Sequence, residues 1–411
     1  MNRFITLALA LCLCACAENS SNFKTNTITI PATPWRFTLD LNGSILPFNG
    51  TFSDVKKNSA TLTLTNHDEK IVIDNVILRN DSAIINLPFF NSEMRLRVES
   101  PYMMSGSWMK LDREDYSIPL NAEQGADYRF TNTSSNLTIA NRYAARFELG
   151  TETEYPAVLV IDNNQGNLTG TFLTETGDYR YLEGNIMNGQ VNLSTFDGSH
   201  AFLFKADIKG DSLVNGVFKS GKSYVTDWYG IADSTASLKQ PDQITSTDSS
   251  TLFDFYLPNQ AGDTVSWNDL DLQDKVVIIE LMGTWCPNCM DASKALSILK
   301  KPYSENKLEI IPVLFEYKDD IEFANIAYKR YRDRIEHMPD QFLLGGKASK
   351  KVAEEKFPML SSVSSFPTLI FIDKNRQVRE VYTGFYGPGT GTYYDEFMES
   401  KRKLLAQLVA E

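Results

Sequence analysis

The first half of the chain consists of short runs in which apolar and polar residues alternate. In "EMRLRVE", Met94, Leu96 and Val98 share one face and the charged side chains share the other. The stretch "AFLFKADI", residues 201–208, alternates in the same way. A period of two, interrupted by turn residues, is typical of antiparallel strands with one buried face. Residues 31–235 are therefore predicted to form an antiparallel all-β domain, either a barrel or a sandwich.

Several short motifs of this half recur about 110 residues further on, in the same order. The paired motifs are "RFTL" at 36–39 with "RFEL" at 146–149, "NGTF" at 49–52 with "TGTF" at 169–172, "INLPFF" at 85–90 with "VNLSTF" at 191–196, and "SGSW" at 105–108 with "NGVF" at 215–218. Such a repeat predicts two related β-meanders that form one closed barrel or two packed sheets. Chance similarity between β-rich segments is the alternative.

The second half has longer apolar runs with helical segments between them. "KVVIIELM", residues 275–282, is a continuous apolar run and predicts a buried central strand. A helix is predicted to start near Pro287, which suits a first helical turn. A second strand is predicted at 308–316, followed by a helix at about 320–335. The stretch "GGKASKKVAEEKF" predicts a further short helix.

The overall organisation follows from composition. Residues 236–252 are polar and rich in Ser and Thr, which predicts an interdomain linker, with an α/β domain at 253–411. The glycine-rich stretch 383–394 lacks the GK[ST] sequence of a phosphate loop and predicts a tight turn before a C-terminal helix. The net charge of −12 provides no basic surface for nucleic acid, so no such partner is expected.

The first residues, "MNRFITLALALCLCACAENSS", carry one cation, Arg3, and then an apolar stretch from Phe4 to Ala15. This stretch is too short for a permanent membrane-spanning helix and fits the core of a secretory signal. The ending "LCAC" resembles a bacterial lipobox, in which the last cysteine, here Cys16, is lipidated and becomes the mature N-terminus. Cys14 departs from the small or aliphatic residue usual at its position.

A lipoprotein signal at 1–16 implies a protein that is anchored in the cell envelope through lipid and faces the periplasm. Residues 17–30 would then form a polar tether off the membrane. Several acyl chains anchor a protein stably, whereas a single chain does not. An ordinary cleaved signal without lipid is the alternative.

Only two cysteines, Cys286 and Cys289, lie beyond the N-terminal region. A secreted protein that depends on structural disulfides spreads several cysteines along its length, and a bridge across two residues removes little chain entropy. A closed zinc site needs four nitrogen or sulfur ligands, and His67, His200 and His337 are isolated in the sequence. The pair is therefore predicted to be a redox-active disulfide, with no metal and no other cofactor.

The predicted strand, the Cys-x-x-Cys motif and the predicted helix follow one another directly, which places Cys286 at a helix N-terminus. The positive end of the helix dipole and the free backbone N–H groups stabilise a thiolate there. Because the thiolate is the attacking species, this position lowers the pKa of the cysteine where reactivity requires it. Cys289, one turn into the helix, is expected to be more buried and to act as the resolving thiol.

At about 250–411 the chain resembles the thioredoxin-like proteins of the TlpA/ResA type, which are exported thiol-disulfide oxidoreductases. "WCPNC" matches the WCxxC active site, "SSFPTLIFIDKNRQV" matches the stretch that carries the cis-proline, and a final strand and helix follow in the expected order. The resemblance implies that Pro367 is the cis-proline and that the Phe366 backbone pairs with an extended substrate chain. It also implies that Trp285 and Pro287 flank the substrate site.

Two acidic residues lie near the predicted site. Glu280 stands six residues before Cys286, where thioredoxins hold a buried acid that accepts the proton of the resolving cysteine. Burial disfavours a charged carboxylate, so the pKa of Glu280 is expected to be raised; a side chain turned to solvent is the alternative. Glu316, at the end of the next strand, is expected to be solvated; an approach to the redox site is the alternative.

The predicted function is that of a membrane-anchored thiol-disulfide oxidoreductase that reduces or exchanges protein disulfides and receives electrons from a membrane-bound thiol protein. Proline stands first between the cysteines here, whereas TlpA and ResA relatives carry it second, so the choice between reductant and oxidant stays open. One alternative is a binding lipoprotein whose β domain holds the ligand. Another is a thiol peroxidase, although the PxxxTxxC signature of peroxiredoxins is missing.

Overall fold

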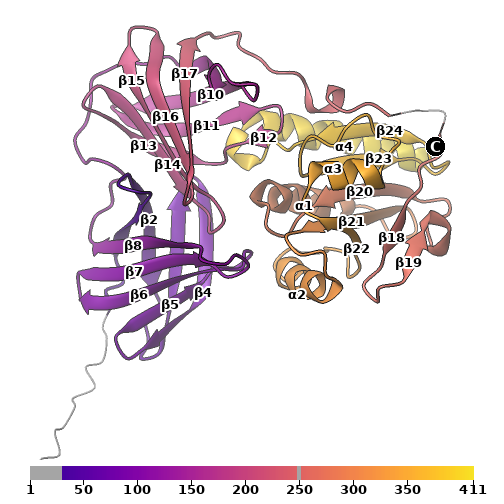
Figure 1. Ribbon diagram of the computed structural model, residues 1–411, viewed down its shortest axis with the longest axis horizontal. Helices are drawn as coiled ribbons and strands as arrows, with labels where there is room; N and C mark the ends of the chain where they lie inside the picture. Colours follow the sequence, from indigo (N-terminus) through magenta and orange to yellow (C-terminus); the bar gives the residue numbers. More distant parts are fainter. Residues whose placement is uncertain (1–29, 248–250) are drawn as a thin grey trace, which may run out of the picture.

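The structure is a computed structural model and describes residues 30–247 and 251–411. Two β-barrels lie beside an α/β domain (Figure 1). The signal segment, Cys16 and nearly all of the tether lie outside the described residues, so these assignments stay predictions. No helix in the described part of the chain is long and apolar enough to cross a membrane.

The first barrel closes because β1 pairs with both β2 and β8. Its strands are β1 (Pro34–Asp40), β2 (Ile45–Ser53), β3 (Ser59–Asn66), β4 (Glu69–Arg79), β5 (Ser82–Asn86), β6 (Ser92–Ser100), β7 (Met103–Lys110) and β8 (Ser117–Gln124). Alternate residues of each strand are buried, as Trp35, Phe37 and Leu39 are in β1. Closure removes the unpaired strand edges that an open sheet would present.

The second barrel is closed by β10, which pairs with both β9 and β11. Its strands are β9 (Arg142–Phe147), β10 (Tyr155–Asn164), β11 (Asn167–Thr174), β13 (Leu182–Met187), β14 (Gln190–Phe196), β15 (Ala201–Lys209), β16 (Ser212–Ser220) and β17 (Tyr224–Ala232). A two-residue strand, β12 (Gly177–Asp178), pairs with the end of β11. The β11–β12 hairpin projects from this barrel toward the α/β domain (Figure 1).

The all-β prediction for the first half is confirmed, but each meander closes on itself, so there are two barrels where one barrel or two sheets were expected. Three of the four repeated motif pairs begin on strands of equal rank, namely β1 with β9, β5 with β14, and β7 with β16. The "NGTF" pair does not, because it lies on the second strand of one barrel and the third strand of the other.

Aromatic side chains fill the second barrel. The ring of Phe147 lies 5.1 Å from that of Phe172, 5.9 Å from that of Phe218 and 5.8 Å from that of Trp228, measured between centroids. All four side chains are at most 2% exposed. The interior is therefore a packed core, as in other barrels of this strand number.

The C-terminal part is a thioredoxin-like α/β domain around a five-stranded mixed sheet of order β22-β21-β20-β23-β24. Its elements are β18 (Tyr256–Pro258), β19 (Thr264–Ser266), β20 (Val276–Met282), α1 (Pro287–Lys300), β21 (Leu308–Glu316), α2 (Ile321–Arg332), β22 (Leu343–Lys347), α3 (Lys350–Lys356), β23 (Thr368–Ile372), β24 (Val378–Thr383) and α4 (Thr392–Ala410). β20 runs parallel to β21 and antiparallel to β23. α1 and α4 pack on one face of the sheet and α3 packs on the other.

Most elements of this domain agree with the sequence prediction, including the strand at 308–316 and the helix that begins at Pro287. The exception is β22, part of which was predicted as a short helix. A Cβ added to Gly345 would lie 2.4 Å from the ring of Phe315 on the neighbouring strand. Glycine therefore permits close packing here, and it also interrupts the β-branched pattern by which a strand is predicted.

The polar segment between the domains lies against the α/β domain. The short 3-10 helix η1 (Pro241–Gln243) is followed by Thr245, whose hydroxyl oxygen lies 2.7 Å from that of Thr383. Thr247 then forms an isolated β-bridge with Leu360. These contacts attach the segment to the domain, while the domain boundaries themselves stay predictions.

We expect Phe172→Ala to destabilise the second barrel by about 3–5 kcal/mol, because it removes a fully buried ring from an aromatic cluster. Chemical denaturation followed by tryptophan fluorescence measures this loss. Val217→Ala, at a side chain that is 40% exposed on the same barrel, is the control. It should change the free energy of unfolding by less than about 1 kcal/mol. Equal effects of the two substitutions would contradict a packed barrel core.

Candidate redox site

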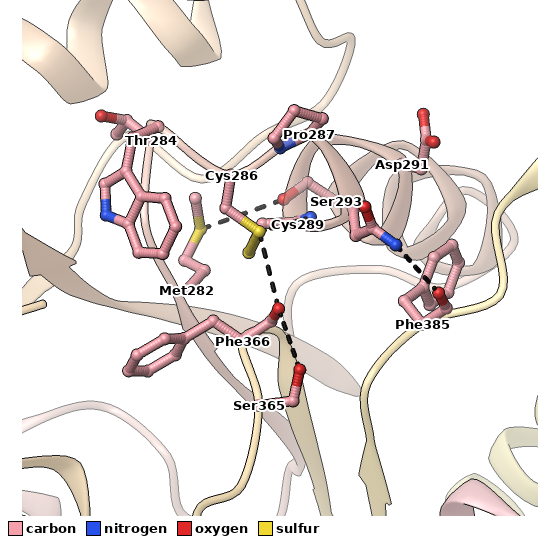
Figure 2. Close-up of a disulfide and its surroundings, with 12 residues drawn as sticks. Met282, Thr284, Cys286, Pro287, Cys289, Asp291, Ser293, Ser365, Phe366 and Phe385 are labelled. Atoms are coloured by element: carbon pink, nitrogen blue, oxygen red, sulfur yellow. Dashed lines mark hydrogen bonds between the residues drawn. A yellow bond between two sulfur atoms is a disulfide. The ribbon is translucent and has the colours of Figure 1, made fainter. Parts of the chain in front are cut away.

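The two cysteines of the motif form a disulfide at the start of α1 (Figure 2). β20 ends at Met282, and after a short loop Cys286 becomes the N-cap residue of α1, with Pro287 as the first helical residue. The backbone N–H of Cys289 lies 3.1 Å from Cys286 Sγ. The helix therefore directs a free N–H group and the positive end of its dipole at the sulfur that is predicted to attack.

Both cysteines are buried. Cys286 is 5% exposed and Cys289 is 0% exposed. They belong to an apolar cluster that also contains Met282, Met290 and, from the first barrel, Phe90. The order of burial fits an attacking and a resolving thiol, but in this arrangement even the outer sulfur is largely withdrawn from solvent.

The loop before β23 faces the disulfide. The peptide bond between Phe366 and Pro367 is cis, as the resemblance implied. The Phe366 carbonyl oxygen lies 3.6 Å from Cys286 Sγ (Figure 2). A disulfide sulfur carries no hydrogen, so this contact becomes a hydrogen bond only when Cys286 is a protonated thiol. The Gly384 N–H donates to the Pro367 carbonyl at 2.9 Å and fixes the loop to the end of β24.

A buried acid holds the loop between β20 and α1. Glu316 accepts hydrogen bonds from the backbone N–H of Thr284 at 2.8 Å and from its hydroxyl at 3.1 Å. The expectation of a solvated Glu316 is wrong, since the residue is 1% exposed. Burial raises the pKa of Glu316 to about 7, and the bonds from Thr284 lower it in part. The carboxyl oxygens thus accept the two hydrogen bonds that the Thr284 N–H and hydroxyl would otherwise donate to water.

Trp285 connects the redox loop to the first barrel. Its indole N–H donates to the Phe315 carbonyl at 2.8 Å, and its ring stacks on Tyr317 at 5.1 Å between centroids. The Tyr317 hydroxyl in turn accepts from Arg113 of the first barrel at 2.6 Å. The predicted docking residue Trp285 is therefore also engaged in contacts within the chain.

The predicted acid Glu280 is fully buried in β20, which excludes the solvent-exposed alternative. The Ser293 hydroxyl, one turn beyond Cys289, donates to Glu280 Oε1 at 2.8 Å and accepts from the Tyr331 hydroxyl at 2.9 Å. Burial raises the pKa of Glu280 to about 8, although the bond from Ser293 lowers it. Glu280 Oε2 has no hydrogen-bond partner among the described residues. That oxygen is free to take up a proton.

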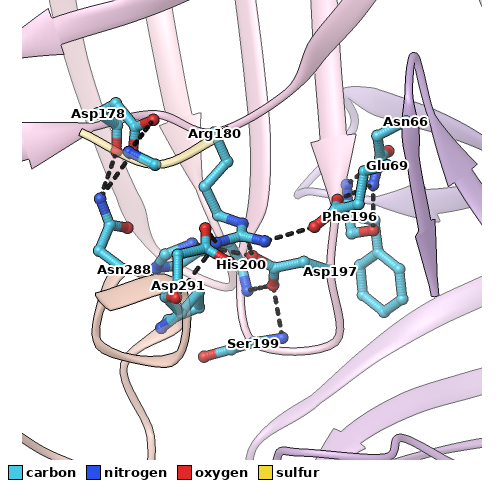
Figure 3. A network of polar contacts seen from close by, with 12 residues as sticks. Asn66, Glu69, Asp178, Arg180, Phe196, Asp197, Ser199, His200, Asn288 and Asp291 are labelled. Atoms are coloured by element: carbon cyan, nitrogen blue, oxygen red, sulfur yellow. Dashed lines mark hydrogen bonds and ion pairs between the residues drawn. The ribbon is translucent and has the colours of Figure 1, made fainter. Parts of the chain in front are cut away.

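A buried arginine joins the redox helix to both barrels (Figure 3). Arg180, two residues after β12, forms ion pairs with Glu69 of the first barrel, with Asp197 of the second at 3.1 Å, and with Asp291 of α1. It also donates to the Pro287 carbonyl at 3.2 Å. Burial alone would lower the pKa of Arg180, but the surrounding carboxylates raise it well above its usual value. The guanidinium therefore keeps its charge although it is 2% exposed.

The residue that departs from the TlpA/ResA pattern makes a second contact with the barrels. The Asn288 amide nitrogen lies 2.7 Å from Asp178 Oδ1 and 3.1 Å from the Asp178 carbonyl (Figure 3). It also lies 3.3 Å from the Phe385 carbonyl. The Gly387 N–H donates to Asp178 Oδ2 at 3.2 Å. Burial raises the pKa of Asp178 to about 7, although Arg180 lowers it. A proline in place of Asn288 would offer no such donor.

Sequence analysis missed the polar residues that support the site. Ser293 follows Cys289 by four residues, and this spacing places both on one helix face, a signal that the sequence did contain. Asp178 lies in the β11–β12 hairpin and Arg180 lies two residues after it, and both are more than 100 residues before their partners in α1. No local sequence pattern predicts a contact between residues so far apart in the chain.

Within residues 30–247 and 251–411, no group of three or more His, Cys, Asp or Glu side chains gathers in a way that could hold a metal ion. A cavity of about 750 Å³ lies in the α/β domain, lined by Lys275, Lys300, His337 and other residues, but by neither cysteine. What the site offers chemically is a pair of sulfurs at a helix N-terminus, with a buried acid behind them.

Residues 250–381 match the AhpC/TSA family, and both barrels lie outside the match. Similar solved structures include a thiol-disulfide isomerase from Corynebacterium glutamicum, at 16% identity, 39% coverage of this chain, 97% coverage of that chain and a TM-score of 0.29. A DsbF homologue from Corynebacterium diphtheriae has 16% identity, coverages of 40% and 96%, and a TM-score of 0.29. A thioredoxin-like protein from Aeropyrum pernix has 20% identity, coverages of 37% and 89%, and a TM-score of 0.27. No curated protein matches the chain.

We expect the oxidised wild-type chain to lose stability relative to Glu280→Gln as the pH rises from about 4.5 to about 8. The fold raises the pKa of Glu280 above its value in the unfolded chain, so across this window the folded state keeps a proton that the unfolded chain releases. Relative to the plateau well below pH 4, the difference in free energy of unfolding should approach about 5 kcal/mol above pH 8, because each pKa unit corresponds to about 1.4 kcal/mol. Denaturant titrations of both proteins across this range measure it, and a difference that does not vary with pH would contradict the buried acid.

Proposed function

We propose that this chain is a thiol-disulfide oxidoreductase whose redox couple is the Cys286/Cys289 pair. The geometry around Cys286 carries the proposal. Its sulfur lies 3.1 Å from the Cys289 N–H at the start of α1 and 3.6 Å from the Phe366 carbonyl. A helix N-terminus stabilises the thiolate that attacks. The loop that holds Pro367 offers backbone groups with which a substrate chain can pair.

In the reduced enzyme, the Cys286 thiolate attacks one sulfur of a substrate disulfide. The substrate S–S bond breaks, and its other sulfur leaves as a thiolate. The Cys289 thiolate then attacks the Cys286 sulfur, which forms the intramolecular disulfide and releases the second substrate sulfur. Two electrons thus pass from the enzyme dithiol to the substrate, and protons complete the two new thiols. A dithiol donor returns the enzyme to its reduced state by the same exchange in reverse.

Glu280 takes up the proton as Cys289 becomes a thiolate. Ser293 holds one carboxyl oxygen at 2.8 Å, which leaves Oε2 for the proton. The pKa of Glu280, raised to about 8 by burial, lies near that of a free thiol, which is about 8.5. Proton transfer between the two groups therefore costs little free energy in either direction.

The finer part of the proposal is activity of the TlpA/ResA type at the cell envelope. Its support is the order of the WCPNC and FPTLIF motifs and the signal-like segment 1–16 with Cys16 as the lipidation site. In this setting the substrates are protein disulfides, and the electron donor is a membrane-bound thiol protein. The protein then faces the periplasm on a lipid anchor.

We expect Cys289→Ala to accumulate mixed disulfides with substrate proteins, because the first exchange proceeds and nothing resolves its product. Cys286→Ala should accumulate none, since the buried Cys289 does not attack. Each variant is first reduced and then incubated with protein substrates that carry disulfides. Non-reducing gels measure the trapped mixed disulfides.

Equal trapping by the two variants would contradict the assigned order of attack. Purified wild-type protein should also reduce insulin disulfides with dithiothreitol as donor. Consumption of hydrogen peroxide without disulfide reduction would instead favour a thiol peroxidase.

We expect Ser293→Ala to slow the resolution of the mixed disulfide at pH 7 by roughly 3- to 10-fold, the effect of losing one buried hydrogen bond. The substitution frees Glu280 Oε1 and should move the pH midpoint of resolution upward, since the bond from Ser293 lowers the pKa of Glu280. Quenched-flow decay of a preformed mixed disulfide, measured across pH, provides the readout. Tyr331→Phe keeps the Ser293–Glu280 bond and should shift the midpoint less, and a larger shift for Tyr331→Phe would contradict the role of Ser293.

A further inference from the structure

The surface beside the cis-proline is occupied by the chain itself. The Ser365 hydroxyl donates to the Thr176 carbonyl at 2.7 Å. Thr176 lies in the turn of the β11–β12 hairpin. Gly384, whose N–H holds the Pro367 carbonyl, packs so closely on this turn that an added Cβ would lie 2.7 Å from the Thr176 carbonyl carbon. The hairpin turn therefore lies against the loop with which a substrate chain is proposed to pair.

Further contacts fix the hairpin on both sides of this turn. The Tyr386 hydroxyl donates to the Thr174 carbonyl at 3.0 Å. On the other side, Asp178 accepts from Asn288, the second of the two residues between the cysteines, and Arg180 pairs with Asp291 of the same helix. The contacts thus extend from the end of β24 across the cis-proline loop to the redox helix.

The hairpin is shaped for close approach. Gly177 has a φ of +131°, which favours glycine, and an added Cβ would lie 2.9 Å from the Asn288 amide nitrogen. Gly384, on the opposite side of the contact, has a φ of +75°. Glycine is the residue that permits both a positive φ and a close backbone contact. Two glycines of this kind meet where the barrel contacts the redox site.

The barrels leave little room for a second protein at the disulfide. Besides the hairpin, Ser199 of the second barrel donates to the Trp285 carbonyl at 3.0 Å, and Phe90 of the first barrel packs in the cluster that contains both cysteines. Cys286 is 5% exposed in this arrangement. An exchange reaction needs a partner sulfur in line with Cys286 Sγ, and the barrels leave a folded partner little room to bring one there.

We propose that the β11–β12 hairpin, residues 174–178, is the specificity-determining element of the redox site: it is a tethered competitor that a protein partner must displace before exchange. This inference rests on the proposed function. The hairpin shows what a partner must replace: a backbone carbonyl acceptor for the Ser365 hydroxyl and a carboxylate or carbonyl acceptor for the Asn288 amide. A protein loop offers both groups, whereas a small thiol offers neither and needs only a path to the sulfur. Contacts between domains of one chain commonly open, particularly where they are polar.

Reduction of the disulfide by two dithiols of different size tests the proposal. The oxidised full chain is mixed with dithiothreitol or with reduced thioredoxin. In each case a donor thiolate attacks Cys286 Sγ, Cys289 leaves as a thiolate, and two electrons pass from the donor dithiol. Acid-quenched samples are alkylated, and peptide mapping reports the Cys286 and Cys289 thiols separately from the N-terminal cysteines.

Asp178→Ala removes the carboxylate that accepts from Asn288 and Gly387 and leaves Asn288 only backbone carbonyl acceptors, and it should raise the rate of reduction by thioredoxin by about 10-fold or more. The rate with dithiothreitol should rise by less than about 3-fold, because a small reagent does not need the whole hairpin displaced. Asp162→Ala, at an exposed residue on β10 of the same barrel, is the matched control and should change neither rate. If Asp178→Ala fails to fold, Tyr386→Phe is the substitute test. It deletes one hydroxyl and should raise the rate of reduction by thioredoxin by about 2- to 5-fold.

The rate of reduction by thioredoxin could be the same in the wild type, Asp178→Ala and Tyr386→Phe. That result would leave the proposed function intact and contradict the competitor role of the hairpin. Equal acceleration of both reductants would also overturn it, because the hairpin would then not discriminate by partner. A disulfide that dithiothreitol reduces only after the chain is unfolded would instead contradict the proposed function.

Discussion

The charge of Arg180 is the constraint on which the arrangement of the molecule depends. A guanidinium that is 2% exposed must be matched by carboxylates, and here they come from both barrels and from the redox helix. Buried ion pairs add little net stability, because desolvation offsets much of the attraction. They do penalise every arrangement in which one partner is missing. The ion pairs with Glu69 and Asp291 therefore specify how the barrels sit on α1 more than they strengthen the fold.

Each barrel meets the redox domain through loops and strand ends, such as Asp178 in β12 and, by way of Arg180, Glu69 at the start of β4, while the rest of its strands enclose a packed core. Arg180 and Asp197 lie in such loops of the second barrel, and Phe90 and Arg113 lie in loops of the first. Loops can vary without disturbing the core on which they are mounted, which is why recognition concentrates there. The barrels thus bear on function through a small number of side chains close to the disulfide.

The sequence sufficed wherever the cause of a structure is local. Continuous apolar runs identified the strand at 308–316, and the position of Cys286 at a helix start follows from the residues on either side of it. It did not suffice where the cause lies elsewhere in the chain. Glu316 is buried because the loop at Thr284 needs an acceptor. Asn288 is buried with its amide hydrogen-bonded because a hairpin about 110 residues earlier supplies its partner.

The position of Cys286 Sγ between two backbone groups has a consequence for the dithiol form. On one side the Cys289 N–H lies 3.1 Å away, and on the other the Phe366 carbonyl oxygen lies 3.6 Å away. An amide hydrogen attracts negative charge on sulfur, whereas a carbonyl oxygen repels it and attracts an S–H hydrogen instead. Two oppositely directed dipoles thus act on a single atom. The acidity of this thiol is a compromise between them, so a small rotation of the Phe366 peptide plane would retune the nucleophile without any change in the helix.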